Sequence, residues 1–134
     1  MPTSVFTYGS LMFADVWQRV VAGQYRSAPA ILPGYFRHAL HDVSYPGIIP
    51  AAHASVTGVV YFDVSDADLL ALDHFEGTDY RRIEASAIGT DGAPVQVQTY
   101  LFLHASRLTG LPWIPESFDL PQFLASYCRD KLGS

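Results

Sequence analysis

The sequence predicts an α+β fold: a small, mostly antiparallel β-barrel with flanking helices. About six extended segments and three helical patterns occur, but not in the alternating order that builds a parallel sheet. Two of the extended segments flank a tight turn at Asp91-Gly92, which predicts a hairpin. Several segments carry apolar or aromatic residues on both faces. Such strands suit a closed barrel, in which one face fills the interior and the other meets helices.

The first half of the chain contains four of the predicted strands and one helix. The strands cover residues 4–8, 28–33, 35–43 and 56–64. β-branched and aromatic residues dominate the last of them, which predicts burial on both of its faces. Apolar residues recur at helical spacing from Phe13 to Val21, and Gly23 follows as a stop. Residues 44–54, which are rich in proline and alanine, are predicted to form a loop.

The second half opens with a helix from Ser65 to Glu76, which Gly77 ends. Ser65 is a suitable N-cap, and Asp68 three residues later resembles a capping box with Asp in place of Glu. The predicted elements after this helix are strands at 82–88 and 94–104 and a C-terminal helix over 120–128.

The composition fits a single domain over residues 1–134. Apolar residues make up 49% of the chain and charged residues only 16%, which favours a buried core over disorder. The formal net charge is −5, and apart from Arg81-Arg82 the basic residues are scattered. Nucleic acids and anionic membranes need a basic face, so we expect neither as a partner. The single cysteine, Cys128, cannot form a disulfide within the chain and is expected to be a small buried apolar residue.

The sequence contains neither a long apolar segment nor a secretory pattern. No run approaches the ~18–20 apolar residues of a membrane span, and the first ten residues lack a basic segment followed by an apolar block. We therefore expect a cytoplasmic protein. The five histidines are scattered, and His38 and His41 fall on opposite faces of a predicted strand, so no metal site is predicted.

The first motif that indicates chemistry is Tyr8-Gly9-Ser10-Leu11, between the first strand and the first helix. A small turn here points successive backbone N–H groups outward, and the helix N-terminus adds partial positive charge. Such a nest holds a carboxylate or an oxyanion, and glycine lets a ligand approach the backbone closely. The same residues also fit a plain strand-to-helix turn in which Ser10 caps the helix.

The second motif centres on Glu76, which shares a helix face with Leu69 and Leu72. Burial and the helix C-terminus should both raise the pKa of an acid on this apolar stripe. A carboxylate of raised pKa suits a general base near neutral pH. Two other interpretations stay open: an acid solvated at a frayed helix end, and an ion partner for Arg81 or Arg82.

Two tyrosines complete the candidate site. Tyr80 lies four residues after Glu76, across a turn, so its hydroxyl can reach the same cavity. Tyr100 lies in the middle of a predicted strand. A barrel mouth is a natural small-molecule site. The alternative for each tyrosine is an aromatic ring packed on the barrel rim.

Taken together, these residues resemble the γ-glutamylcyclotransferase-like family, in its smaller AIG2-like and γ-glutamylamine cyclotransferase branch. The matching segments occur in the family's order and cover roughly residues 5–104. They are residues 5–11, 32–35, 45–50, 56–61 and 72–77, followed by Tyr80, Arg82 and Tyr100.

The resemblance implies an enzyme with one cavity and Glu76 as its general acid/base. It implies that the backbone from Tyr8 to Leu11 holds the γ-glutamyl portion of a small substrate. The α-amino group of that substrate attacks its own side-chain carbonyl, which gives 5-oxoproline and a free amine or amino acid. Nucleophile and electrophile lie in one molecule, so no cofactor or metal is expected. The substrate-binding residues are then Tyr8, Gly9, Ser10, Leu11, Tyr80 and Tyr100.

Residues 105–134 resemble nothing in the family and are treated as a divergent C-terminal segment of the same domain. Two roles stay open for them: folding over the cavity, where they would select the amine, or forming an ordered tail that docks the last helix. A barrel that binds a small ligand without turning it over is the alternative to the enzyme. The sequence does not predict an oligomeric state.

Overall fold

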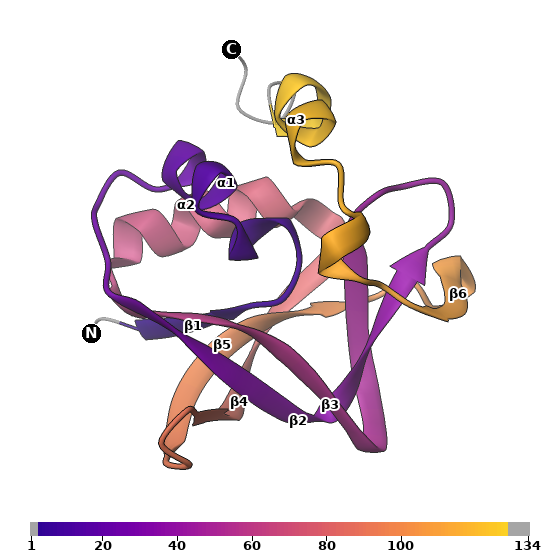
Figure 1. The fold of residues 1–134 in the computed structure, drawn as a ribbon. Coiled ribbons are helices and arrows are strands. Elements are labelled where there is room, and N and C mark those ends of the chain that lie inside the picture. The colour runs from indigo at the N-terminus through magenta and orange to yellow at the C-terminus, as the bar shows by residue number, and fades with distance from the viewer. Residues whose placement is uncertain (1–2, 129–134) are drawn as a thin grey trace.

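The structure is a computed structural model and describes residues 3–128. Over these residues the chain forms six β-strands and three α-helices. The strands are β1 (Thr3–Thr7), β2 (Ser27–Leu40), β3 (Pro46–Val64), β4 (Tyr80–Gly89), β5 (Pro94–Phe102) and β6 (Leu108–Pro112). The helices are α1 (Ala14–Val20), α2 (Asp66–Glu76) and α3 (Leu120–Phe123). Figure 1 shows the strands curled into a barrel, with all three helices on the same side of it.

Five strands close the barrel. They run in the order β3-β1-β5-β4-β2, and β2 pairs again with β3 to complete the ring. The neighbours are antiparallel except β1 and β5, which run parallel where Val5 meets Gln98. β6 adds to the far end of β2, with Leu108 opposite Leu40. The predicted α+β fold, a mostly antiparallel barrel with flanking helices, is confirmed.

The barrel wall separates two apolar cores. In β1, Val5 packs with the core that the helices cover, while its neighbour Phe6 packs with the core inside the barrel. In β3, the neighbours Tyr61 and Val60 divide in the same way. Successive side chains of a strand point to opposite faces, so both faces of these strands are buried. This is the reason why several segments of the sequence are apolar throughout.

The loop predicted at residues 44–54 is wrong over most of its length. β3 begins at Pro46 and pairs with β2 through Ile48 and Ile49, which lie opposite Arg37 and Phe36. Proline at the first position of a strand costs no ladder hydrogen bond. Pairing with β2 outweighs the low strand preference of proline and alanine. The local sequence cannot show this pairing, because the partner strand is a separate segment of the chain.

The strands predicted at 28–33 and 35–43 are one strand, β2. Gly34 lies between them with a positive φ of 86°, and the register with β3 shifts between Pro33 and Tyr35. The glycine therefore marks a bulge in a continuous strand, not a break. The strand β6 was not predicted, because Gly110 and Pro112 lower its local preference.

Helix α2 begins and ends as predicted, but its capping box forms only in part. The Ser65 hydroxyl accepts a hydrogen bond from the N–H of Asp68 at 3.2 Å. The Asp68 carboxylate binds the loop after α1: it accepts from the N–H groups of Ala22 and Gly23, each at 2.9 Å, and from the Tyr25 hydroxyl at 2.6 Å. These bonds tie the start of α2 to the loop that leads into β2.

The predicted hairpin forms between β4 and β5, with Gly92 at a φ of 83° in its turn. The predicted C-terminal helix also forms, as α3 followed by π-helical backbone over Leu124–Cys128. The expectation for the Cys128 side chain lies outside the side chains that the structure describes.

Candidate functional site

A cavity lies where the end of β1, the end of α2 and the start of β4 meet. The space between its lining atoms is about 400 Å³, with open solvent at the mouth included. The seven residues named from the sequence all line it: Tyr8, Gly9, Ser10, Leu11, Glu76, Tyr80 and Tyr100. Phe6, Thr7, Tyr45, Pro46 and Phe75 complete the lining. All five are sequence neighbours of the named residues or of each other. Phe6 and Thr7 belong to β1, Phe75 belongs to α2, Pro46 begins β3 and Tyr45 precedes it.

The turn after β1 presents buried amides to this cavity. A single 3₁₀ turn, Ser10–Met12, follows Gly9, and the Met12 N–H bonds back to the Gly9 carbonyl at 3.0 Å. Opening amides of a helical turn have no acceptor within it. Among the described residues, the N–H groups of Gly9, Ser10 and Leu11 have no protein acceptor. The turn therefore offers a row of donors to an anionic group.

The geometry of this turn differs from the sequence prediction in one respect. Helix α1 does not follow the motif directly, because Phe13 is extended between the 3₁₀ turn and Ala14. Phe13 is the N-cap of α1 and no side chain caps that helix, so the alternative in which Ser10 caps it is wrong. The partial positive charge at the turn comes from its own amides.

Arg37 holds the start of the turn, and the sequence analysis did not identify it. Its Nη1 donates to the Tyr8 carbonyl and to the Thr57 carbonyl, each at 2.9 Å. Its guanidinium also lies 5.3 Å from the centre of the Trp113 ring. An arginine on an alternating strand gives no local signal for such a role, because both carbonyls come from other elements.

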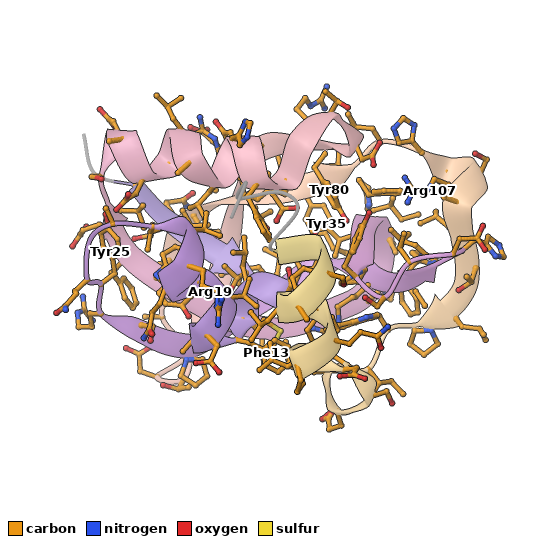
Figure 2. The ribbon with its side chains drawn as sticks, turned by 90° about the horizontal axis from the view of Figure 1, so that it is seen from above. Phe13, Arg19, Tyr25, Tyr35, Tyr80 and Arg107 are labelled. Atoms are coloured by element: carbon orange, nitrogen blue, oxygen red, sulfur yellow. The ribbon has the colours of Figure 1, made fainter. Side chains whose placement is uncertain are left out.

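Three tyrosine hydroxyls around the cavity donate to the protein. The Tyr8 hydroxyl donates to the Tyr100 carbonyl at 2.6 Å, and the Tyr80 hydroxyl donates to the Pro46 carbonyl at 2.6 Å. The Tyr100 hydroxyl donates to Asp73 Oδ1 at 2.7 Å. Figure 2 looks down on the helices and shows Tyr80 close to the end of α2. These tyrosines are buried in the core and also line the cavity.

Glu76 is the last residue of α2, and its half-buried side chain lines the cavity. Gly77, with a φ of 78°, ends the helix and donates its N–H to the Asp73 carbonyl. Arg82, one of the two arginines considered as an ion partner for Glu76, binds Asp73 through Nε at 2.9 Å and Nη2 at 3.1 Å. The helix stop therefore points the acid at the cavity, across from the turn.

The negative charge of Glu76 affects the pKa of two tyrosines that line the cavity, Tyr8 and Tyr100. Burial, together with the negative charge of Glu76, raises the pKa of Tyr8 well above its usual range. Burial, the hydrogen bond to Asp73 and the charges of Asp73 and Glu76 raise the pKa of Tyr100. Both phenols are therefore protonated at neutral pH.

The described part of the C-terminal segment packs against the elements that carry the site. Phe118 stacks on Phe13 with 5.1 Å between ring centres, and Phe123 meets the edge of Phe75 at 6.4 Å. Figure 2 shows Phe13 beside α3. From residue 105 to residue 126, where side chains are described, none lines the cavity. These contacts dock α3 onto α2 and onto the turn after β1.

Among the side chains that the structure describes, residues 3–126, no three His, Cys, Asp or Glu gather where they could hold a metal ion. The backbone is described over residues 3–128. No helix in that range combines the length and the apolar character needed to cross a membrane.

Comparison with known proteins gives the family. Residues 5–117 match the family described as gamma-glutamyl cyclotransferase, AIG2-like. AIG2-like protein D of Arabidopsis thaliana is 36% identical over 104 residues, which are 78% of this chain and 68% of that protein. Protein AIG2 C of the same plant is 34% identical over 102 residues, 75% of this chain and 62% of that protein. The match thus spans about two thirds of the length of these relatives.

Solved structures agree on the fold. A protein from Arabidopsis thaliana, determined in solution, superposes with a TM-score of 0.73 at 27% identity, covering 99% of this chain and 79% of its own. A structure titled gamma-glutamyl cyclotransferase superposes with a TM-score of 0.68 at 18% identity, covering 78% of this chain and 68% of its own. The family match over most of the chain, with the shared barrel, shows that the chain belongs to the AIG2-like gamma-glutamyl cyclotransferase family.

Proposed function

We propose that the chain is a γ-glutamyl cyclotransferase that releases 5-oxoproline and a free amine or amino acid from a small γ-glutamyl compound. The observation that carries the proposal is that Glu76 and the amides of the turn after β1 line one cavity. In the reaction, the α-amino nitrogen forms a bond to the γ-carbonyl carbon, and the bond from that carbon to the leaving nitrogen breaks. The attacking nitrogen loses two protons as it changes from an ammonium group to the lactam N–H, and the leaving nitrogen gains two and departs as an ammonium group, so no outside reactant is consumed. The proton lost before the attack must be carried to the leaving nitrogen.

Glu76 is proposed as the group that moves this proton. The ammonium group must lose a proton before its nitrogen can attack, and the leaving nitrogen must gain one. A carboxylate inside the cavity can do both in turn. General acid–base catalysis of this kind contributes about 10²–10⁴-fold to a rate.

The turn from Gly9 to Leu11 is proposed as the anion site. Its amides can hold the α-carboxylate of the substrate or meet the negative charge that grows on the γ-carbonyl oxygen. Holding one end of the glutamyl chain also limits its flexibility. Bringing nitrogen and carbonyl together in this way supplies several kcal/mol of the barrier reduction.

The test is 5-oxoproline release from a panel of γ-glutamyl amides, measured by chromatography. The wild-type chain should form product from at least one member, and Glu76→Gln should lower kcat by about 100-fold or more with its circular dichroism unchanged. The matched control is Glu84→Gln, which neutralises an exposed acid of β4 and should leave kcat at the wild-type value. An unchanged kcat in Glu76→Gln excludes Glu76 as the proton carrier.

The same panel separates an enzyme from a binding protein. Calorimetry shows whether a member of the panel binds. Tight binding of one member without product from any of them contradicts the proposed function and favours the non-catalytic barrel.

A further inference from the structure

Asp73 is a carboxylate just outside the cavity whose contacts the proposed reaction does not use. It lies three residues before Glu76 on α2. Its Oδ1 accepts hydrogen bonds from the Tyr100 hydroxyl at 2.7 Å and from Arg82 Nε at 2.9 Å, and its Oδ2 accepts from Arg82 Nη2 at 3.1 Å. The arginine grips both oxygens, and its Nη1 also donates to the Gln98 side chain. This fork fixes the carboxylate in place.

The contact with Asp73 decides how Tyr100 can bind a ligand. A phenol has one proton to donate and lone pairs that accept. Asp73 is an acceptor held by an arginine, so it takes that proton in a strong, charge-assisted bond. The Tyr100 oxygen, which belongs to a residue lining the cavity, then has only lone pairs left for a ligand.

Tyr80 has the same polarity, because its proton goes to the Pro46 carbonyl. Tyr8 donates to the Tyr100 carbonyl, and its oxygen accepts from the backbone N–H of Ile48. Tyr80, Tyr100 and Glu76 therefore give the cavity lining hydrogen-bond acceptors, and the turn from Gly9 to Leu11 gives it donors. A ligand that satisfies both sets carries an N–H group at one end and an anionic oxygen at the other.

We propose that Asp73 is a positioning residue: by taking the Tyr100 proton, it makes Tyr100 an acceptor for the α-ammonium group of the ligand. The identity of that ligand rests on the proposed function, since a γ-glutamyl compound carries this group beside a carboxylate. Arg82 acts indirectly: it fixes the Asp73 carboxylate, and that carboxylate accepts the Tyr100 proton.

The test compares L-glutamate with glutarate, which differs from it only by lacking the ammonium group. Isothermal titration calorimetry gives both affinities without requiring turnover. The wild-type chain should prefer L-glutamate. Tyr100→Phe and Asp73→Ala should each weaken L-glutamate binding by about 10- to 100-fold and leave glutarate binding unchanged, as expected for one lost hydrogen bond to a charged group. The double variant should bind L-glutamate no more weakly than the weaker single variant, because both changes remove the same contact.

The chain contains a matched control on the same helix. Asp68 also accepts a tyrosine hydroxyl, that of Tyr25 at 2.6 Å, but neither residue lines the cavity. Figure 2 shows Tyr25 well away from Tyr80. Asp68→Asn and Tyr25→Phe should therefore leave the preference for L-glutamate over glutarate unchanged, whatever they do to stability.

Several outcomes overturn the inference. These are L-glutamate binding in Asp73→Ala as tight as in the wild type, equal loss of both ligands in that variant, additive losses in the double variant, and a wild-type chain that binds neither ligand or shows no preference. If Asp73→Ala does not fold, Arg82→Gln takes its place in the cycle, because it removes the fork that holds the carboxylate. A preference for L-glutamate that depends on Asp73, without 5-oxoproline release from any amide, contradicts the proposed function alone. Release with no such preference contradicts the inference alone.

Discussion

Gly9 shows how a single missing side chain shapes the site. Its φ of −126° lies outside the left-handed region, so a positive φ is not what requires glycine here. What requires it is space: a Cβ atom on Gly9 would lie 2.8 Å from Cδ of Pro46 and 2.9 Å from its Cγ. Pro46 is rigid and its carbonyl accepts the Tyr80 hydroxyl, so the turn, the start of β3 and Tyr80 are packed as one unit.

Gly9→Ala should therefore act through Pro46. We expect a loss of about 1–3 kcal/mol in the free energy of unfolding, as for other overpacked sites, measured by urea denaturation. Adding Pro46→Ala removes the two ring atoms that the new methyl group meets, and should recover part of the loss. A Gly9→Ala chain as stable as the wild type would show that the turn moves freely away from Pro46. A larger side chain at Gly9 would displace Pro46 as well as any ligand. A change of ligand affinity in such a variant therefore does not by itself show that the ligand lies against Gly9.

At the scale of the element, three of the four carboxylates of helix α2 have three different surroundings. Asp68 binds the loop after α1, Asp73 binds Tyr100 and Arg82, and Glu76 lines the cavity. Leu69 and Leu72 between them are buried in the core that separates the helix from the barrel. The helix thus places polar groups at both ends while its apolar stripe fixes its position.

Helix α3 is short and depends on aromatic contacts. Phe123 is 3% exposed and touches Phe75, which lines the cavity, and Phe118, which stacks on Phe13. Four residues of α-helix are too few to be stable by themselves. The aromatic contacts therefore decide whether the segment docks.

Phe123→Ala should detach this helix and loosen the cavity wall. Truncation of a buried phenylalanine costs about 3–5 kcal/mol when the whole fold feels it. Thermal denaturation measures that loss, and hydrogen exchange of residues 118–126 shows whether it stays local. Gln122→Ala, at an exposed position of the same helix, is the control and should change neither. Unchanged stability and exchange in Phe123→Ala would show that the segment is held by other contacts.

At the scale of the whole molecule, the shortest strand pairing of the barrel is the seam between β1 and β5. β1 and β5 meet in parallel and share a register only at Val5 and Gln98. The Thr99 hydroxyl adds a bond across this seam, because it donates to the Phe6 carbonyl at 2.9 Å from a side chain that is 0% exposed. The cavity lies beside the same seam, since Phe6 is part of its lining.

Thr99→Val keeps the shape of the side chain and removes that bond. The buried carbonyl of Phe6 loses a partner, so we expect the free energy of unfolding to fall by about 1–3 kcal/mol. Thr109→Val is the control: its hydroxyl donates to the Ala39 carbonyl at 2.8 Å, outside the closed ring and only half-buried. Its loss should be smaller. Equal losses in the two variants would show that the seam is not specially dependent on this hydroxyl.

Local patterns predicted much of this molecule. The Ser65 cap and the Gly77 stop bound α2, and Asp91-Gly92 forms the turn of the hairpin. Strands that are apolar on both faces indicated a closed barrel before any pairing was known. These predictions succeeded because capping, turn chemistry and the two-residue period of a strand depend on neighbours along the chain.

Tertiary structure alone decided the rest. The stretch around Ile48 and Ile49 became a strand because β2 offered it partners, against its own proline-rich composition. Asp73 and Arg37 acquired their contacts from groups far along the chain: the Tyr100 hydroxyl in one case, the Tyr8 and Thr57 carbonyls in the other. The physical reason is that a hydrogen bond or a strand pair depends on the element that folding brings alongside, and no residue encodes its distant partner in its own neighbourhood.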